Sequence, residues 1–198
     1  LKWTDVSFPS GSLLDQQRPI GITGGRTHTV GWGFVYETLD FEPYPTKGSW
    51  YELYFNWYGP YTYSDYRFFR TTFTYKRFIQ LHPKLVFAHR TLFEGLSGDV
   101  PFYELGSVGG SDPTIGFGGD KFFHGFESNR FIDHVRGALG FELRWDPIAF
   151  TFAKQDLIIG FVPFLDVGRV WNKRLIIRTD VAINQDGTSM FLELGSAF

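Results

Sequence analysis

The chain has 198 residues and a formal net charge of −2 at pH 7, which suits one domain and gives no electrostatic reason to expect nucleic-acid binding. It lacks cysteine, which excludes a disulfide framework and thiol chemistry, and it has no apolar run of about 18 residues for a membrane helix. Aromatic residues make up 20% of the chain, yet the mean hydropathy is slightly negative at −0.14. Alternating strands with an apolar belt would give this composition, and so would a sugar-binding sandwich rich in surface aromatic residues.

Regular strand patterns begin at Val30. Residues 1–28 contain repeated proline and glycine with weak periodicity, so we expect a loop, a turn or a poorly defined first strand there. Beyond them, aromatic and aliphatic residues alternate with polar ones at the period of two that is typical of a β-strand. Strands are predicted at residues 30–37, 51–57, 69–76 and 85–94, and a turn with proline and glycine at residues 43–48.

Charged residues recur on one face of the third and fourth of these strands. They are Arg70, Lys76, Arg90 and Glu94, and they lie on the face away from the phenylalanines. In a soluble β-sandwich such charges would face water and the phenylalanines would form the core. In a membrane barrel the same charges would face the lumen and the phenylalanines would face lipid. Periodicity alone leaves both arrangements open.

The second half of the chain begins with a long glycine-rich stretch. Residues 97–132 contain few strand patterns, and a segment of this length in a compact domain is usually functional or disordered. Strands resume at residues 136–145, 158–168 and 175–183, and a tight turn at 184–187 precedes a last strand at 188–198. Eight strands with almost no helical periodicity predict an all-β fold.

Catalytic and metal-binding motifs find little support. The five histidines have no H-x-H or H-x-x-x-H spacing, so a metal site is not expected. The sequence has no G-x-S-x-G motif and no cysteine nucleophile. The glycines at 116–119 do not precede a predicted helix, as a phosphate-binding loop would. We therefore expect neither an enzyme nor a bound cofactor.

Several short motifs follow one another from residue 36 to the end of the chain. They are residues 36–40 (YETLD), 45–48 (PTKG), 101–105 (PFYEL, followed by Gly109 and Gly110), 123–126 (FHGF), 142–144 (ELR), 164–168 (FLDVG) and 191–198 (FLELGSAF). Together and in this order they resemble motifs of the BamA/TamA-type outer-membrane superfamily, also called bacterial surface antigens. The resemblance covers roughly residues 30–198.

The resemblance implies a fold, a location and a role. The expected fold is a single antiparallel transmembrane β-barrel over residues 1–198, in the outer membrane of a Gram-negative bacterium. Residues 97–132 would form a long extracellular loop that folds back into the lumen. The implied role is the insertion or translocation of outer-membrane proteins. Outer-membrane lipids, client barrel proteins and other assembly subunits are the implied partners.

The resemblance also implies two groups of site residues. The loop motif in the lumen is formed by Phe123, His124, Gly125 and Phe126, and its partners on the lumen wall are Glu142, Arg144 and Asp166. The second group is the terminal strand, with Phe191, Gly195 and Phe198. This strand would form the seam at which the barrel opens.

The sequence departs from the family pattern at several points. His124 and Leu39 stand where the family has arginines. The family's barrels have sixteen strands, so we expect residues to be missing near Val170 and Trp171, or a reduced barrel. Within these 198 residues we expect no POTRA module ahead of the barrel. A passive barrel that serves as an anchor, a small pore or a complex subunit therefore stays an alternative, as does a soluble aromatic-rich binding sandwich.

Overall fold

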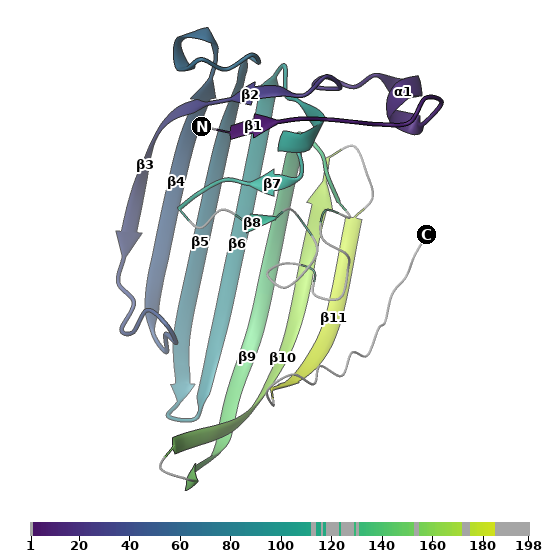
Figure 1. The fold of residues 1–198 in the computed structure, drawn as a ribbon. Coiled ribbons are helices and arrows are strands. Elements are labelled where there is room, and N and C mark those ends of the chain that lie inside the picture. The colour runs from purple at the N-terminus through teal and green to yellow at the C-terminus, as the bar shows by residue number, and fades with distance from the viewer. Residues whose placement is uncertain are drawn as a thin grey trace.

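A computed structural model describes residues 2–111, 114–115, 117, 123, 129, 131–152, 155–171 and 175–184. Its main feature is one antiparallel sheet whose seven strands curve around a loop that lies on one face (Figure 1). None of the helices in the described residues is long and apolar enough to cross a membrane.

The seven strands of this sheet follow one another along the chain. They are β3 (Thr29–Glu37), β4 (Gly48–Tyr58), β5 (Phe68–His82), β6 (Leu85–Gly98), β9 (Val135–Phe152), β10 (Gln155–Val170) and β11 (Leu175–Asn184). Each pairs with the next, and β6 pairs with β9 across the long loop, so the sheet is a simple meander. The first seven predicted strands are thus confirmed. The eighth, at 188–198, lies outside the described residues.

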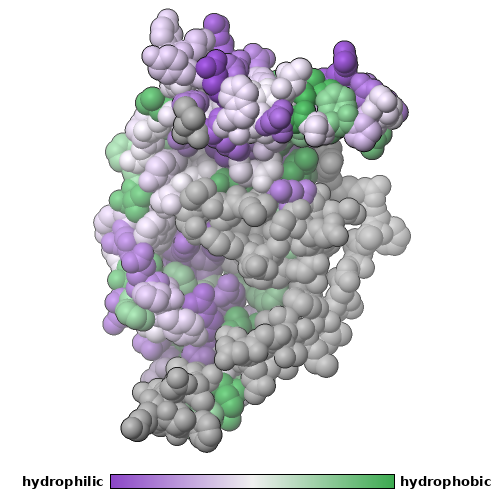
Figure 2. Space-filling model, in the orientation of Figure 1, coloured by the Kyte–Doolittle hydropathy of each residue, from purple (hydrophilic) through white to green (hydrophobic). Residues whose placement is uncertain are grey.

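The two faces of the sheet differ in the way that a barrel wall requires. Thr72 and Glu94 are fully buried on the face that the loop covers, here called the inner face. Phe93, one residue before Glu94, is 42% exposed on the opposite, outer face. Figure 2, in the orientation of Figure 1, shows hydrophilic residues at the lower left of the molecule and also along its top. Charges inside and phenylalanines outside are the reverse of a soluble sandwich, so the structure favours the barrel. Within the described residues the sheet is an open arc with β3 and β11 at its edges.

The two ends of the sheet carry different connections. At one end, here called the turn end, β5 and β6 are joined by residues 83–84, and β3 and β4 by residues 38–47. At the other, here called the loop end, residues 59–67 contain a 3-10 turn, η1 (Pro60–Thr62), and residues 99–134 form the long loop. The long loop contains η2 (Phe102–Glu104) and a small hairpin of β7 (Ser107–Val108) and β8 (Thr114–Ile115).

The N-terminal arm crosses the loop end of the sheet (Figure 1). It holds a short strand pair, β1 (Lys2–Thr4) with β2 (Gly25–Thr27), and one helix, α1 (Leu13–Gln17), and is otherwise irregular. The arm is attached to residues 59–67 through Asp65, whose carboxylate accepts hydrogen bonds from the backbone (2.8 Å) and the guanidinium (2.9 Å) of Arg26. This pair is exposed, so we expect little stability from it.

The turn between β3 and β4 is organised by one carboxylate. Asp40 accepts hydrogen bonds from the backbone N–H of Thr46 (2.9 Å) and Lys47 (3.2 Å) and from the Thr46 hydroxyl (2.5 Å). Gly48 follows with φ of +112°, and a Cβ there would overlap with the carbonyl oxygen of Thr38. Asp40 belongs to the YETLD motif, and Thr46 and Gly48 belong to the PTKG motif. All three residues close this turn, which gives both motifs a local structural role.

The carboxylate of Asp40 makes the turn sensitive to acid. The hydrogen bond from the Thr46 hydroxyl is the main reason that the pKa of Asp40 lies well below its usual range, and the backbone N–H of Lys47 adds to it. A lowered folded-state pKa stabilises the turn above the unfolded value of about 4, and this contribution is lost as the pH falls further. We expect the Asp40 carboxyl resonance, followed by NMR, to titrate well below pH 4. In Thr46→Val it should titrate closer to pH 4, and equal titration in both proteins would refute the assignment.

Candidate functional site

A buried ion pair lies at the centre of the contact between the long loop and the inner face. Glu94 on β6 pairs with Arg136 on β9, and both side chains are fully buried. Arg136 Nε donates to Glu94 Oε1 at 3.1 Å, and the Thr72 hydroxyl on β5 donates to Glu94 Oε2 at 2.9 Å. Three adjacent strands of the wall thus converge on one charged centre.

This ion pair binds the main chain of the loop. The Gly109 N–H donates to Glu94 Oε2 at 2.7 Å, and Arg136 donates to the carbonyl oxygens of Leu105 (2.7 Å) and Ser107. A buried charge is tolerated when its hydrogen-bonding capacity is satisfied, and here the loop backbone supplies part of it. The loop therefore completes the coordination of a charged pair that the strands alone leave incomplete.

A second ion pair fixes the start of the loop. Arg70 on β5 donates to the carboxylate of Glu104 at 3.1 Å and to its carbonyl oxygen at 2.9 Å. The other carboxylate oxygen of Glu104 accepts from Lys2 at 2.7 Å and from the Thr27 hydroxyl at 3.0 Å. Glu104 therefore joins the wall, the long loop and the N-terminal arm.

A third contact explains the paired glycines of the loop. Glu52 on β4 accepts hydrogen bonds from the N–H (3.1 Å) and the hydroxyl of Ser111. A Cβ on Gly110, whose φ is +113°, would overlap with Glu52 Oε1, and a Cβ on Gly109 would lie 2.8 Å from the Thr72 hydroxyl. Only glycine allows the backbone to approach the wall this closely.

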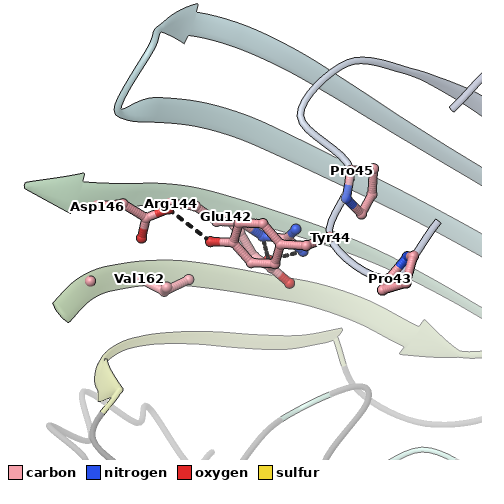
Figure 3. A pocket seen from close by; sticks show the side chains of 8 residues that line it. Pro43, Tyr44, Pro45, Glu142, Arg144, Asp146 and Val162 are labelled. Carbon is pink, nitrogen blue, oxygen red and sulfur yellow. Dashed lines mark hydrogen bonds and ion pairs between the residues drawn. The ribbon is translucent and has the colours of Figure 1, made fainter. Parts of the chain in front are cut away.

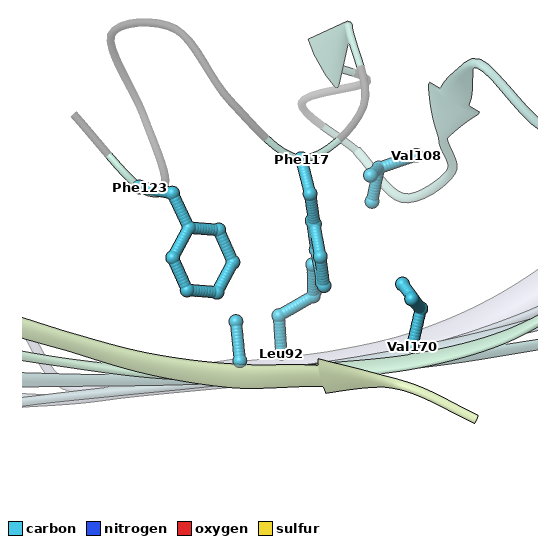
Figure 4. Close-up of a cluster of buried hydrophobic side chains, with 6 residues drawn as sticks. Leu92, Val108, Phe117, Phe123 and Val170 are labelled. Carbon is cyan, nitrogen blue, oxygen red and sulfur yellow. The ribbon is translucent and has the colours of Figure 1, made fainter. Parts of the chain in front are cut away.

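Phe123 anchors the apolar part of the loop. Its ring is fully buried and lies 5.3 Å from that of Phe117, in a cluster that also contains Leu92, Val108, Ala138 and Val170 (Figure 4). The Phe123 N–H donates to Asp166 Oδ2 on β10 at 3.0 Å. Gly168, two residues further along β10, lies beneath the ring, and a Cβ there would overlap with Phe123 Cζ. Asp166 and Gly168 of the FLDVG motif thus bind the backbone and accommodate the ring of the same loop residue.

Glu142 and Arg144 lie nearer the turn end of the inner face. They form an ion pair at 2.8 Å, and the Arg144 guanidinium lies 5.3 Å from the ring centre of Tyr44. The Tyr44 hydroxyl donates to Asp146 Oδ2 at 3.1 Å (Figure 3). These residues and the turn 38–47 surround a cavity of about 440 Å³. Burial, and then the neighbouring Asp146, raise the pKa of Tyr44, so its hydroxyl remains a donor at neutral pH.

The predicted site residues therefore occupy different places. Asp166 contacts Phe123, whereas Glu142 and Arg144 surround the cavity beside the turn 38–47. His124, Gly125, Phe126, Phe191, Gly195 and Phe198 lie outside the described residues, and their roles remain predictions. The described part of the chain contains no group of three or more histidine, aspartate and glutamate side chains that could hold a metal ion.

Sequence reasoning missed the pairing of Glu94 with Arg136 and of Arg70 with Glu104. The available signal was the recurrence of Arg70 and Glu94 opposite the phenylalanines. Their partners come from β9 and from the loop, so only the fold brings them together. The site contains hydrogen-bonded charges without an evident nucleophile, and its arrangement serves to hold a loop in one position.

Comparison with known proteins identifies one family and one similar fold. The chain matches the Omp85 superfamily domain over residues 25–186. It is also similar to the crystal structure of BamA from Haemophilus ducreyi lacking POTRA domains 1–3, with a TM-score of 0.58 and 18% sequence identity. The match covers 72% of this chain and 30% of that chain, so this chain spans under a third of the length of that BamA. No curated protein matches it.

Proposed function

Because the chain belongs to the Omp85 superfamily of outer-membrane β-barrel proteins, we propose that it helps to insert other proteins into the outer membrane or to move them across it. The observation that supports this role best is the fixed position of the long loop on the inner face. Two buried ion pairs and Asp166 hold its backbone at several points. A barrel that serves only as an anchor or a small pore has no evident need for so many buried charges, since burying each charge costs desolvation energy.

The orientation of the barrel follows from its connections. Outer-membrane barrels have short turns on the periplasmic side and longer loops outside. The turn end would accordingly face the periplasm, and the N-terminal arm and the start of the long loop would lie at the cell surface. Client strands arriving from the periplasm would then meet the turn end first.

In the proposed mechanism the loop supports the wall while a seam elsewhere opens. The seam would involve the terminal strand with Phe191, Gly195 and Phe198. A strand edge exposed there presents unpaired N–H and C=O groups, which can template an incoming strand by β-augmentation. The loop would brace β5, β6, β9 and β10, so that opening is confined to the seam. Phe123 to Phe126 would contribute to this bracing from the loop side.

The role of the loop can be tested through Asp166. In proteoliposomes, Asp166→Ala should slow the insertion of a client barrel about tenfold, because one charge-assisted hydrogen bond to Phe123 is lost. The folded fraction, measured by heat-modifiable gel mobility, should not change. Asp65→Ala, which removes an exposed carboxylate at the loop end, is the control and should insert clients at the normal rate.

A second variant replaces residues 122–126 with glycine and serine. We expect the same slowing as in Asp166→Ala. Unchanged client insertion in both folded variants would argue against the insertion role and for a passive barrel.

A further inference from the structure

The outer face has an open apolar groove near the turn end. It has a volume of about 630 Å³, and the described residues that line it are Leu85, Leu143, Trp145, Phe161 and Pro163. They come from β6, β9 and β10. Leu143 is 36% and Trp145 49% exposed. The groove faces away from the lumen and the loop, on the side that meets lipid.

The pairing between β9 and β10 is irregular beside the groove. Phe164 on β10 pairs with Glu142 on β9, and Phe161 pairs with Trp145. The two β10 residues between them, Val162 and Pro163, have no paired residue on β9 in the described strands. Proline lacks the N–H that the ladder needs, and the pairing of Pro163 with β11 continues. The register then shifts between Phe161 and Ile159, which is the pattern of a β-bulge.

A lysine lies next to the groove in the chain. Lys84 lies in the β5–β6 turn, next to Leu85, and its ammonium group donates to the carbonyl oxygen of Pro147 at 2.8 Å. Its own carbonyl oxygen accepts from the N–H of Asp146 at 2.9 Å. An ammonium group has three donors, so Lys84 retains capacity for a further acceptor. The carboxylate of Asp146 is turned to Tyr44 on the inner face.

We propose that this groove binds an acyl chain of a glycerophospholipid from the periplasmic leaflet, and that Lys84 pairs with the phosphate of the same lipid. A protein segment in this dry groove would have to satisfy its own backbone polar groups, whereas an acyl chain has none. Trp145 pairs with Leu85, the first residue of β6, so it supplies an aromatic ring on the turn-end side of the groove, where a membrane interface favours tryptophan. The site rests on the barrel fold and is independent of the proposed insertion role.

Native mass spectrometry of the detergent-purified protein with dioleoyl phosphatidylglycerol tests the apolar part. Leu143→Trp fills the groove and should reduce the retained lipid about tenfold, since several methylene groups lose their burial. Leu139→Trp is the matched control, because Leu139 lies on the same face and strand and is 39% exposed. It should retain lipid as the wild type does. If Leu143→Trp fails to fold, Leu85→Trp fills the groove from β6.

The charged part is tested with Lys84→Gln. In this variant the preference for phosphatidylglycerol over phosphatidylcholine should be about fivefold smaller than in the wild type. Equal lipid retention in Leu143→Trp and Leu139→Trp would overturn the proposal, because the bound lipid would then be a general annulus. A protein dimer that forms through the groove and excludes lipid would also overturn it.

Discussion

Replacing Arg136 with methionine should lower the free energy of unfolding by about 3–5 kcal/mol. The substitution keeps most of the side-chain volume but removes the only partner that pairs with Glu94 by charge among the described residues. Glu94 would then be buried with the Thr72 hydroxyl and the Gly109 N–H as its described donors. The carbonyl oxygen of Leu105 would lose its donor as well, and that of Ser107 would keep the longer bond from Arg70 at 3.3 Å.

Urea unfolding in lipid vesicles, followed by tryptophan fluorescence, measures this loss. Arg26→Met is the control, since Arg26 also pairs with a carboxylate but is exposed at the loop end. It should leave the unfolding midpoint where it is in the wild type. The double variant Glu94→Gln/Arg136→Met should regain part of the stability, because it removes the unpaired charge. If Arg136→Met alone is as stable as the wild type, the ion pair of Glu94 and Arg136 does not hold the loop.

Adding one methyl group at Gly168 should displace the long loop from the wall. The new Cβ of Gly168→Ala would overlap with Phe123 Cζ and lie 2.7 Å from the carbonyl oxygen of Gly137. Overpacking of this kind typically costs about 1–3 kcal/mol. Since the loop is easier to move than the sheet, we expect Phe123 to leave its site. Limited proteolysis in detergent should cleave within residues 99–134 at least about tenfold faster than in the wild type, because a loss of 1.4 kcal/mol changes an opening equilibrium tenfold.

Gly95→Ala is the matched control for this experiment. Gly95 is also a strand glycine, and an added Cβ there would meet no described atom within 4 Å. Its loop should therefore be cleaved at the wild-type rate. Phe123→Leu in the Gly168→Ala background should restore part of the protection, since leucine is shorter than phenylalanine. A Gly168→Ala protein with a fully protected loop would mean that the sheet moves and that Phe123 does not anchor the loop.

The strands were predictable because alternation with a period of two is a local property of the sequence. The prediction for β9 ended at Trp145, whereas the strand continues to Phe152. The reason is the bulge near Pro147, which shifts the register by one residue, so that Ile148 pairs with Ile159. A pattern search that assumes unbroken alternation stops at such a position.

The site was predictable only in part. The FLDVG motif identified Asp166, and the structure places this residue against Phe123. Glu94 and Arg136 could not be paired from the sequence, because 42 positions separate them and the intervening loop supplies part of their coordination. Alternation is also the same whether the charged face lines a barrel lumen or faces bulk water. The sequence pattern therefore left open which of the two environments the charged face meets.

The wall recognises the loop mainly through its peptide groups. The N–H groups of Gly109, Ser111 and Phe123 and the carbonyl oxygens of Leu105 and Ser107 are all bound by wall side chains. Peptide groups are the same in every residue except proline, which lacks the N–H. Apart from Glu104, Gly109, Gly110 and Phe123, whose side chains or lack of one also matter, the described loop residues that are bound in this way can therefore change in sequence while these contacts stay. The constraint falls largely on the strands, where Arg136 and Arg70 each bind two carbonyl oxygens of the loop and Glu52, Glu94 and Asp166 each bind one N–H group.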